Sequence, residues 1–252
     1  MFVGMLLFSC FISTASAKDM DPSDDPSLIF LRAGGGGSNG GSSGGSSGDS
    51  GGATHHSGGR YRTSQLQSIL EFIMLPIILF SSSLLFYVKL SKRSRKSKKL
   101  MKQMMKKDRA WKFKDISSIV NQSFFAIQTA WTNMDMSPAK KYMSDELYQN
   151  FQTKLNWMAY RNQKNILENI QLVKALPVAV YDDIDNSRDY VWFYVKGNMV
   201  DYIINTDTRS IISGNTSATT FVEYWQFVRK DSQWVLNRIL QKNETNQISF
   251  SE

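Results

Sequence analysis

The chain has 252 residues, of which 42% are hydrophobic, and a formal net charge of +8. The excess charge is local, because residues 60–109 carry thirteen basic and two acidic groups, whereas residues 110–252 carry fifteen of each. A domain that binds nucleic acid would need basic residues over its folded surface, so this distribution argues against that class. The single cysteine, Cys10, excludes a disulfide framework and a thiolate metal site.

The N-terminal quarter of the chain predicts segments that lie outside any folded core. Residues 1–17 join an apolar run to Ala-Ser-Ala, which is typical of a secretory signal peptide. No basic residue precedes that run, so a second membrane anchor is the alternative. Residues 18–33 form an acidic, proline-bearing tail, and residues 34–59 a Gly/Ser-rich linker that we expect to be a flexible coil. The linker histidines, His55 and His56, have no third ligand nearby, so we predict no metal site.

An uncharged apolar run predicts a transmembrane helix over residues 69–88, since about twenty apolar residues match the hydrocarbon thickness of a bilayer. Eleven basic residues follow this run up to Arg109, and only Arg60 and Arg62 lie just before it. The positive-inside rule then places the N-terminus outside and the C-terminal domain in the cytoplasm. We therefore predict a single-pass protein of the inner (cytoplasmic) membrane.

Residues 89–110 predict a polybasic juxtamembrane helix whose partner is anionic phospholipid. Leu100 and Met104, like Met101 and Met105, are spaced four residues apart, so one helix face would be apolar and would rest in the acyl boundary. The alternative is a solvated segment that only fixes the topology. The residues predicted to bind lipid are Lys92, Arg93, Arg95, Lys96, Lys98, Lys99, Lys102, Lys106 and Lys107.

Residues 111–243 predict one α+β domain, and residues 244–252 a flexible tail. Capping residues predict helices that start at Asp115, Ser137 and Ser144. β-Forming residues predict strands over residues 165–180, 190–204, 221–229 and 233–240, with a polar loop over residues 205–218. Helices followed by a meandering sheet are typical of α+β domains in which helices pack on a curved antiparallel sheet.

Several blocks of this region resemble the Tim-44-like family, which is named for the 44-kDa subunit of the mitochondrial inner-membrane import translocase. The blocks are Trp111–Gln128, Tyr142–Ser144, Asn165–Ile170, Asp201–Ile204, Phe221–Arg229 and Trp234–Leu236. The resemblance implies a cone-shaped, nuclear-transport-factor-2-like fold and association with an inner membrane. The long chaperone-recruiting half of the mitochondrial protein has no counterpart here, so its role as an import-motor scaffold is not carried over.

These features predict a membrane-tethered, non-catalytic binding module that supports membrane-protein assembly or protein transport. Its expected partners are the membrane and other inner-membrane proteins, with no cofactor. Trp192, Tyr224 and Trp225 are candidates either for the core or for a hydrophobic cavity or partner surface. Strand alternation places Tyr224 and Trp225 on opposite faces of the sheet, so only one of these two can face a cavity.

Two alternatives stay open. One is a secretion-system subunit of similar cone fold, whose domain would lie outside the cytoplasm. The other is an isomerase- or dehydratase-like enzyme that pairs Asp201 with Tyr202 or Tyr194, although the domain contains no histidine. Asp182, Asp183 and Asp185 resemble a calcium loop only weakly, because the glycine and distal glutamate of an EF-hand are missing.

Overall fold

The computed structural model describes residues 65–184 and 188–250, and the side chains of the first helix from residue 84 onward. The predicted signal peptide, acidic tail, Gly/Ser linker and the turn at residues 185–187 lie outside these residues. The elements, in chain order, are α1 (Gln65–Met104), η2 (Arg109–Trp111), α2 (Phe113–Thr132), η3 (Ser137–Tyr142), α3 (Asp145–Tyr160), β1 (Gln163–Tyr181), β2 (Tyr190–Asn205), β3 (Ile211–Lys230), β4 (Gln233–Gln241) and η4 (Lys242–Gln247).

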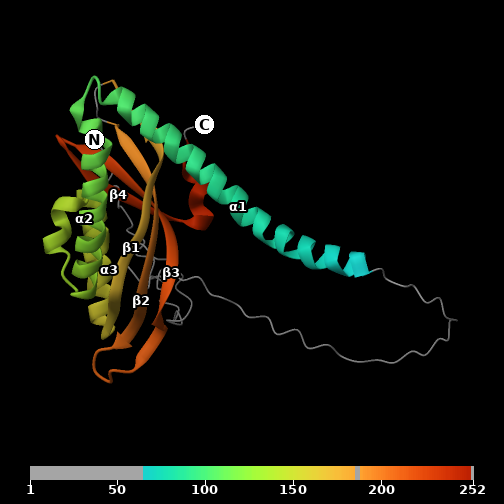
Figure 1. Ribbon diagram of the computed structural model, residues 1–252. Helices are drawn as coiled ribbons and strands as arrows, with labels where there is room; N and C mark the ends of the chain where they lie inside the picture. Colours follow the sequence, from blue (N-terminus) through green and yellow to red (C-terminus); the bar gives the residue numbers. More distant parts are fainter. Residues whose placement is uncertain (1–64, 185–187, 251–252) are drawn as a thin grey trace, which may run out of the picture.

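The four strands form one antiparallel sheet in the order β1-β2-β3-β4, so each strand pairs with its neighbour in sequence. Helices α2 and α3 cover one face of the sheet (Figure 1). The described half of α1 runs along the other side, together with η4 (Figure 1). The predicted α+β class is confirmed, with helices on both faces of the meander.

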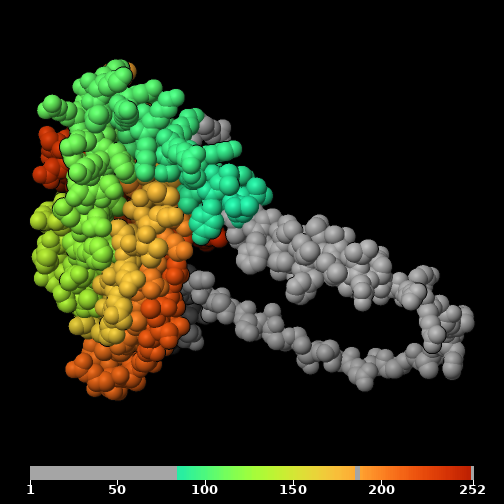
Figure 2. All heavy atoms as spheres, viewed as in Figure 1, coloured from blue at the N-terminus to red at the C-terminus, as the bar shows by residue number. Residues whose placement is uncertain are grey.

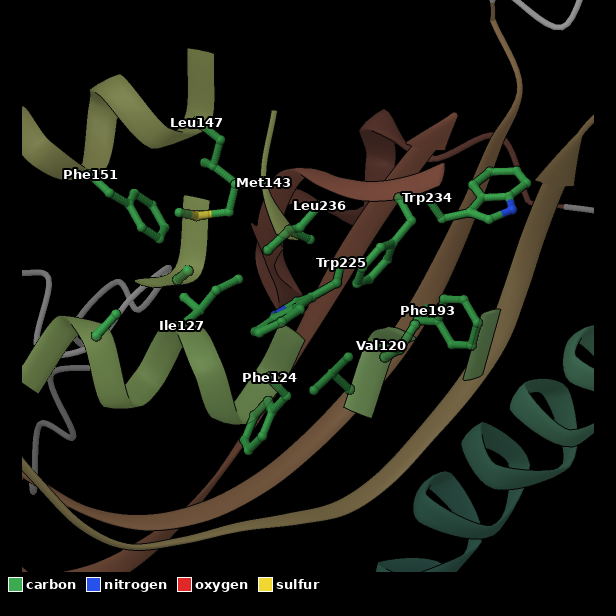
Figure 3. Close-up of a cluster of buried hydrophobic side chains, with 14 of the residues drawn as sticks. Val120, Phe124, Ile127, Met143, Leu147, Phe151, Phe193, Trp225, Trp234 and Leu236 are labelled. Atoms are coloured by element: carbon green, nitrogen blue, oxygen red, sulfur yellow. The ribbon is translucent and has the colours of Figure 1, made fainter. Parts of the chain in front are cut away.

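The larger hydrophobic core lies between the sheet and α2. Val120, Phe124 and Ile127 recur at helical spacing on α2 and are fully buried, as their periodicity predicted. The Phe124 ring centroid lies 5.6 Å from that of Trp225 on β3. Figure 3 shows other buried side chains of this core: Met143, Leu147, Phe151, Phe193, Trp234 and Leu236.

The predicted helix starts are close to those observed. The Ser144 hydroxyl caps α3 by accepting a hydrogen bond from the Leu147 amide at 3.3 Å. The segment that begins at Ser137 is a 3-10 helix instead of an α-helix. It ends at Tyr142 because the chain then pairs with β4, where the Ser144 amide donates to the Leu236 carbonyl at 2.8 Å.

The loop predicted over residues 205–218 is wrong, because β3 already begins at Ile211. All ten residues from 211 to 220 are exposed, so this half of the strand has no buried face and no apolar alternation. Gly214 pairs with Tyr202 at a φ of +98°, and a Cβ there would lie 2.5 Å from the Asp201 carbonyl oxygen. A polar strand was therefore mistaken for a loop.

Helix α1 contains the predicted membrane span at residues 69–88, and its backbone is helical throughout. The side chains of residues 65–83 lie outside the description. Within the described part of the chain, no helix is long and apolar enough to cross a membrane. The transmembrane segment therefore stays a prediction.

Candidate functional site

The described half of α1 has two faces with different roles. Leu90, Ser94, Ser97 and Met101 recur at spacings of four, three and four residues, and each is at most 5% exposed. This spacing forms one seam along the helix, and the small serines allow the helix to approach the sheet closely. Figure 2 shows the coloured part of α1 lying against the domain, and the buried seam lies on the covered side of the helix.

The seam joins both hydrophobic cores. Leu90 belongs to a smaller cluster on the second face of the sheet, with Trp192, Tyr194 and Tyr224 among its members. Met101 is part of the larger core between the sheet and α2. The folded unit therefore begins inside α1, ahead of the boundary predicted at residue 111.

Two side chains at the C-terminal end of the described chain pack against α1 and the sheet. Ile248 is 6% exposed within the smaller cluster, and the Phe250 ring centroid lies 3.7 Å from the guanidinium carbon of Arg93. Phe250 also contacts the Tyr224 ring at a centroid distance of 6.2 Å. The flexible tail predicted over residues 244–252 is therefore wrong up to residue 250, because η4 and these two apolar side chains pack on the sheet.

The cationic residues of α1 lie mostly on the face opposite the seam. Two of the nine predicted lipid ligands are engaged within the domain: Arg93 stacks on Phe250, and the Lys98 ammonium lies 4.5 Å from the Phe113 ring centroid. The other seven side chains are exposed: Lys92, Arg95, Lys96, Lys99, Lys102, Lys106 and Lys107. They can therefore reach an anionic partner.

The apolar face predicted for this segment packs against the domain core. Met101 is fully buried, and Met104 and Met105 pack half-buried against the same core. The prediction that this face rests in the acyl boundary of a bilayer is therefore wrong for Met101, which the domain covers completely, whereas Met104 and Met105 are only partly covered.

Acidic groups near the end of α1 pair with the domain. The Asp108 carboxylate accepts the Ala110 amide at 2.9 Å and also pairs with Arg229. The Ala110 amide and the Arg229 guanidinium hold the pKa of Asp108 below its usual range. Arg229 Nη1 also donates to the buried Asp189 carboxylate at 3.3 Å, so the α1–α2 connection is tied to β3.

We expect Asp108→Asn to lower the free energy of unfolding by about 1–2 kcal/mol at pH 7. Because the folded state lowers the pKa of Asp108, its stabilising effect is present above the unfolded pKa and is lost as pH falls through the folded pKa. The difference between wild type and variant should therefore shrink below about pH 4. Urea unfolding at several pH values measures it, with the exposed Asp231→Asn as the control.

The three candidate cavity residues lie inside the packed cores. Trp192, Tyr224 and Trp225 are at most 4% exposed, and Trp225 Nε1 donates to the buried Glu223 carboxylate at 2.9 Å. Tyr224 and Trp225 point to opposite faces of the sheet, as predicted. None of the three is accessible to a partner, because helices cover both faces at this level.

Asp201, the acid of the enzyme alternative, is held in a structural network. Trp131 Nε1 donates to Asn165 Oδ1 at 3.0 Å, and Asn165 Nδ2 donates to Asp201 Oδ1 at 2.9 Å and to the Tyr202 carbonyl at 3.2 Å. This network joins α2 to β1 and β2. Burial raises the pKa of Tyr194 to about 12, so it is a poor candidate for a general base at neutral pH.

The aspartates of the weak calcium motif also have other partners. Asp182 accepts the indole N–H of Trp111 at 2.9 Å, and Asp183 pairs with Arg188. Among the described residues, which exclude Asp185, no group of three His, Cys, Asp or Glu side chains could hold a metal ion.

An exposed groove of about 670 Å³, which no motif in the sequence indicated, lies between η3 and the β3–β4 turn. Lys140, Lys141 and Lys230 line it beside Asp145 and Asp231, and Lys230 already pairs with Asp145 at 2.6 Å. The mixed charges give it no clear ligand preference. The exposed cationic face of α1 is therefore the strongest candidate site of the described chain.

A four-stranded antiparallel meander with a hydrophobic core on each face defines an α+β domain. The sequence model of the Tim44-like domain family matches residues 97–241, more than half of the chain, and the chain belongs to that family. The match begins within α1, in agreement with the seam that binds α1 to the domain.

Comparison with solved structures finds a likeness to the intermembrane space region of the chloroplast protein ARC6. The identity is 12% and the TM-score 0.37, over 51% of this chain and 96% of that one. Comparison with curated proteins finds no match.

Proposed function

We propose that this chain is a membrane-tethered, non-catalytic binding module that supports the assembly or transport of inner-membrane proteins. In this proposal α1 crosses the bilayer over residues 69–88, the domain has the cone-shaped, nuclear-transport-factor-2-like form, and it stands on the cytoplasmic face. The Tim44-like family supports a scaffold role. The structural network that holds Asp201 supports a role without catalysis.

One observation carries the membrane proposal. Leu84, Leu85, Tyr87 and Val88 are 42–65% exposed, and ten cations with no intervening acid follow them between residues 89 and 107. Large apolar side chains that stay exposed on a folded protein mark a contact with lipid or another protein. An abrupt change from apolar to cationic residues along one helix is typical of a membrane boundary on the cytoplasmic side.

The helix also determines which cations can contact lipid. At about 1.5 Å per residue, Lys92, Arg95 and Lys96 lie about 6–12 Å beyond Val88 along the axis. The headgroup layer is about 5–7 Å thick, and screening at physiological salt acts over about 8 Å. We therefore assign anionic phospholipid contact to these first turns, where each cation contributes on the order of 1 kcal/mol.

Lipid retention tests this assignment. Full-length protein extracted with mild detergent should retain phosphatidylglycerol, and the triple change Lys92→Gln, Arg95→Gln and Lys96→Gln should lower the amount retained at least about threefold, because three lipid-facing charges are lost. Mass spectrometry of the purified protein measures it. Equal retention by wild type and variant would contradict lipid contact. The matched control neutralises the exposed Lys114, Lys140 and Lys141, far from the predicted boundary, and should change nothing.

Protease protection tests the orientation. A reporter fused after Glu252 should resist protease added to spheroplasts and be digested once the membrane is opened with detergent. Digestion of the reporter in intact spheroplasts would instead favour the secretion-system alternative, whose domain lies outside the cytoplasm.

A further inference from the structure

Four lysines, Lys99, Lys102, Lys106 and Lys107, lie on the last turns of α1 and in the turn that follows it, and we call them the distal lysine cluster. All four are exposed. Among the described residues, none of the four has a carboxylate or ring partner. The neighbouring acid, Asp108, is paired with Arg229. The charge of this cluster is therefore not neutralised within the described domain.

The distal lysine cluster lies too far along the helix to contact the bilayer, provided that α1 spans it as proposed above. Lys99 lies about 16 Å and Lys102 about 21 Å beyond Val88 along the axis. A helix tilt of about 40° brings Lys99 to about 13 Å, within reach of lipid, but still leaves Lys102 about 16 Å away, beyond the headgroups and the screening length. The cationic face cannot lie flat on the lipid instead, because α1 is one continuous helix from Gln65 to Met104 and carries this face away from the bilayer together with the span.

Such a row of like charges is unfavourable in isolation. Lys99 and Lys102 are three residues apart on the helix, so their side chains are neighbours. Lys106 and Lys107 follow in the turn after Met104, and no acidic residue lies between residues 89 and 107. The C-terminal end of the helix dipole offsets part of this repulsion. An external anion would offset the rest and would be attracted along the whole row.

We propose that the distal lysine cluster is a docking site for an acidic segment of a partner protein in the aqueous phase. A polypeptide fits this surface better than nucleic acid, because none of the described residues places an exposed ring beside the lysines for bases to stack on. Trp111 is fully buried, and the Phe113 ring lies beneath Lys98. The half-buried Met104 and Met105 add adaptable apolar contacts for side chains of the partner.

The test uses full-length protein in nanodiscs of zwitterionic lipid and a fluorescein-labelled oligoglutamate peptide as the probe, read by fluorescence anisotropy. Neutralising the cluster with Lys99→Gln, Lys102→Gln, Lys106→Gln and Lys107→Gln should weaken peptide binding at least about tenfold. The matched control neutralises four exposed lysines elsewhere, Lys114, Lys140, Lys141 and Lys174, and should change affinity less than about twofold. Equal losses in both variants would overturn the proposal.

Two further measurements distinguish an acidic peptide from nucleic acid and from anionic lipid. A single-stranded oligonucleotide of equal charge should bind more weakly than the peptide, and tighter cluster-dependent binding of the oligonucleotide would overturn the proposal in favour of nucleic acid. Nanodiscs rich in phosphatidylglycerol should leave peptide affinity unchanged, whereas a loss there would show that lipid covers the cluster. If the chain does not insert into nanodiscs but still binds the peptide through the cluster in detergent, the membrane proposal fails and the docking site stands.

Discussion

Replacing Met101 with alanine is expected to lower the free energy of unfolding by about 2–4 kcal/mol. Met101 is fully buried in the larger core, together with Trp111 and Ile116, so truncation removes apolar contacts and leaves a cavity. An equal change in a solvated juxtamembrane segment would cost almost nothing. Urea unfolding of the full-length protein in mild detergent, followed by tryptophan fluorescence, measures the difference.

The matched control for this change is Leu100→Ala. Leu100 is the adjacent residue of α1 but lies half-exposed, outside both core clusters, so its truncation should cost less than about 1 kcal/mol. Equal effects of the two substitutions would mean that α1 is not part of the folded unit. The domain would then begin near residue 111.

The second large effect is expected for Asn165→Ala, which should cost about 3 kcal/mol. Asn165 is fully buried, accepts the indole N–H of Trp131 and donates to the Asp201 carboxylate. Without the amide, the Trp131 indole and the Asp201 carboxylate each lose a buried hydrogen bond, and part of the link between α2 and β2 goes with them. Thermal unfolding and near-ultraviolet circular dichroism measure the loss.

The matched control for Asn165→Ala is another asparagine with a weaker contact. Asn198→Ala, on the same strand as Asp201, removes only a 3.4 Å contact with Thr220 and should cost less than about 0.5 kcal/mol. Wild-type stability of the Asn165→Ala protein would show that the network does not hold the fold. The Asp201 carboxylate would then regain its standing as a catalytic candidate.

Local patterns predicted most of the domain correctly. The stripe of Val120, Phe124 and Ile127 predicted the buried face of α2 because every member is apolar at helical spacing. Strand alternation placed Tyr224 and Trp225 on opposite faces, but it could not show that helices cover both faces. Their burial depends on α1 and α2, which are distant in the sequence. The sequence therefore left core and cavity open for these residues, and the structure places them in the core.

Features that depend on distant partners were missed. The seam of α1 includes two serines among many lysines, so its composition indicated a solvated or lipid-bound segment, although the 90, 94, 97 and 101 spacing was present. The contacts of Ile248 and Phe250 with the sheet and α1 are equally remote in sequence. The first half of β3 has no buried face, and hydrophobic alternation cannot report a strand that is exposed.

The unbroken backbone of α1 has a consequence for neighbours within the membrane plane. A helix that is fixed to the sheet by Leu90 and Met101 cannot turn about its axis independently of the domain. In the tethered arrangement, a protein packed against one side of the transmembrane helix would therefore always meet the same side of the domain. A single residue inserted between Val88 and Leu90 would rotate the domain by about 100° relative to the span, while leaving the fold of each intact.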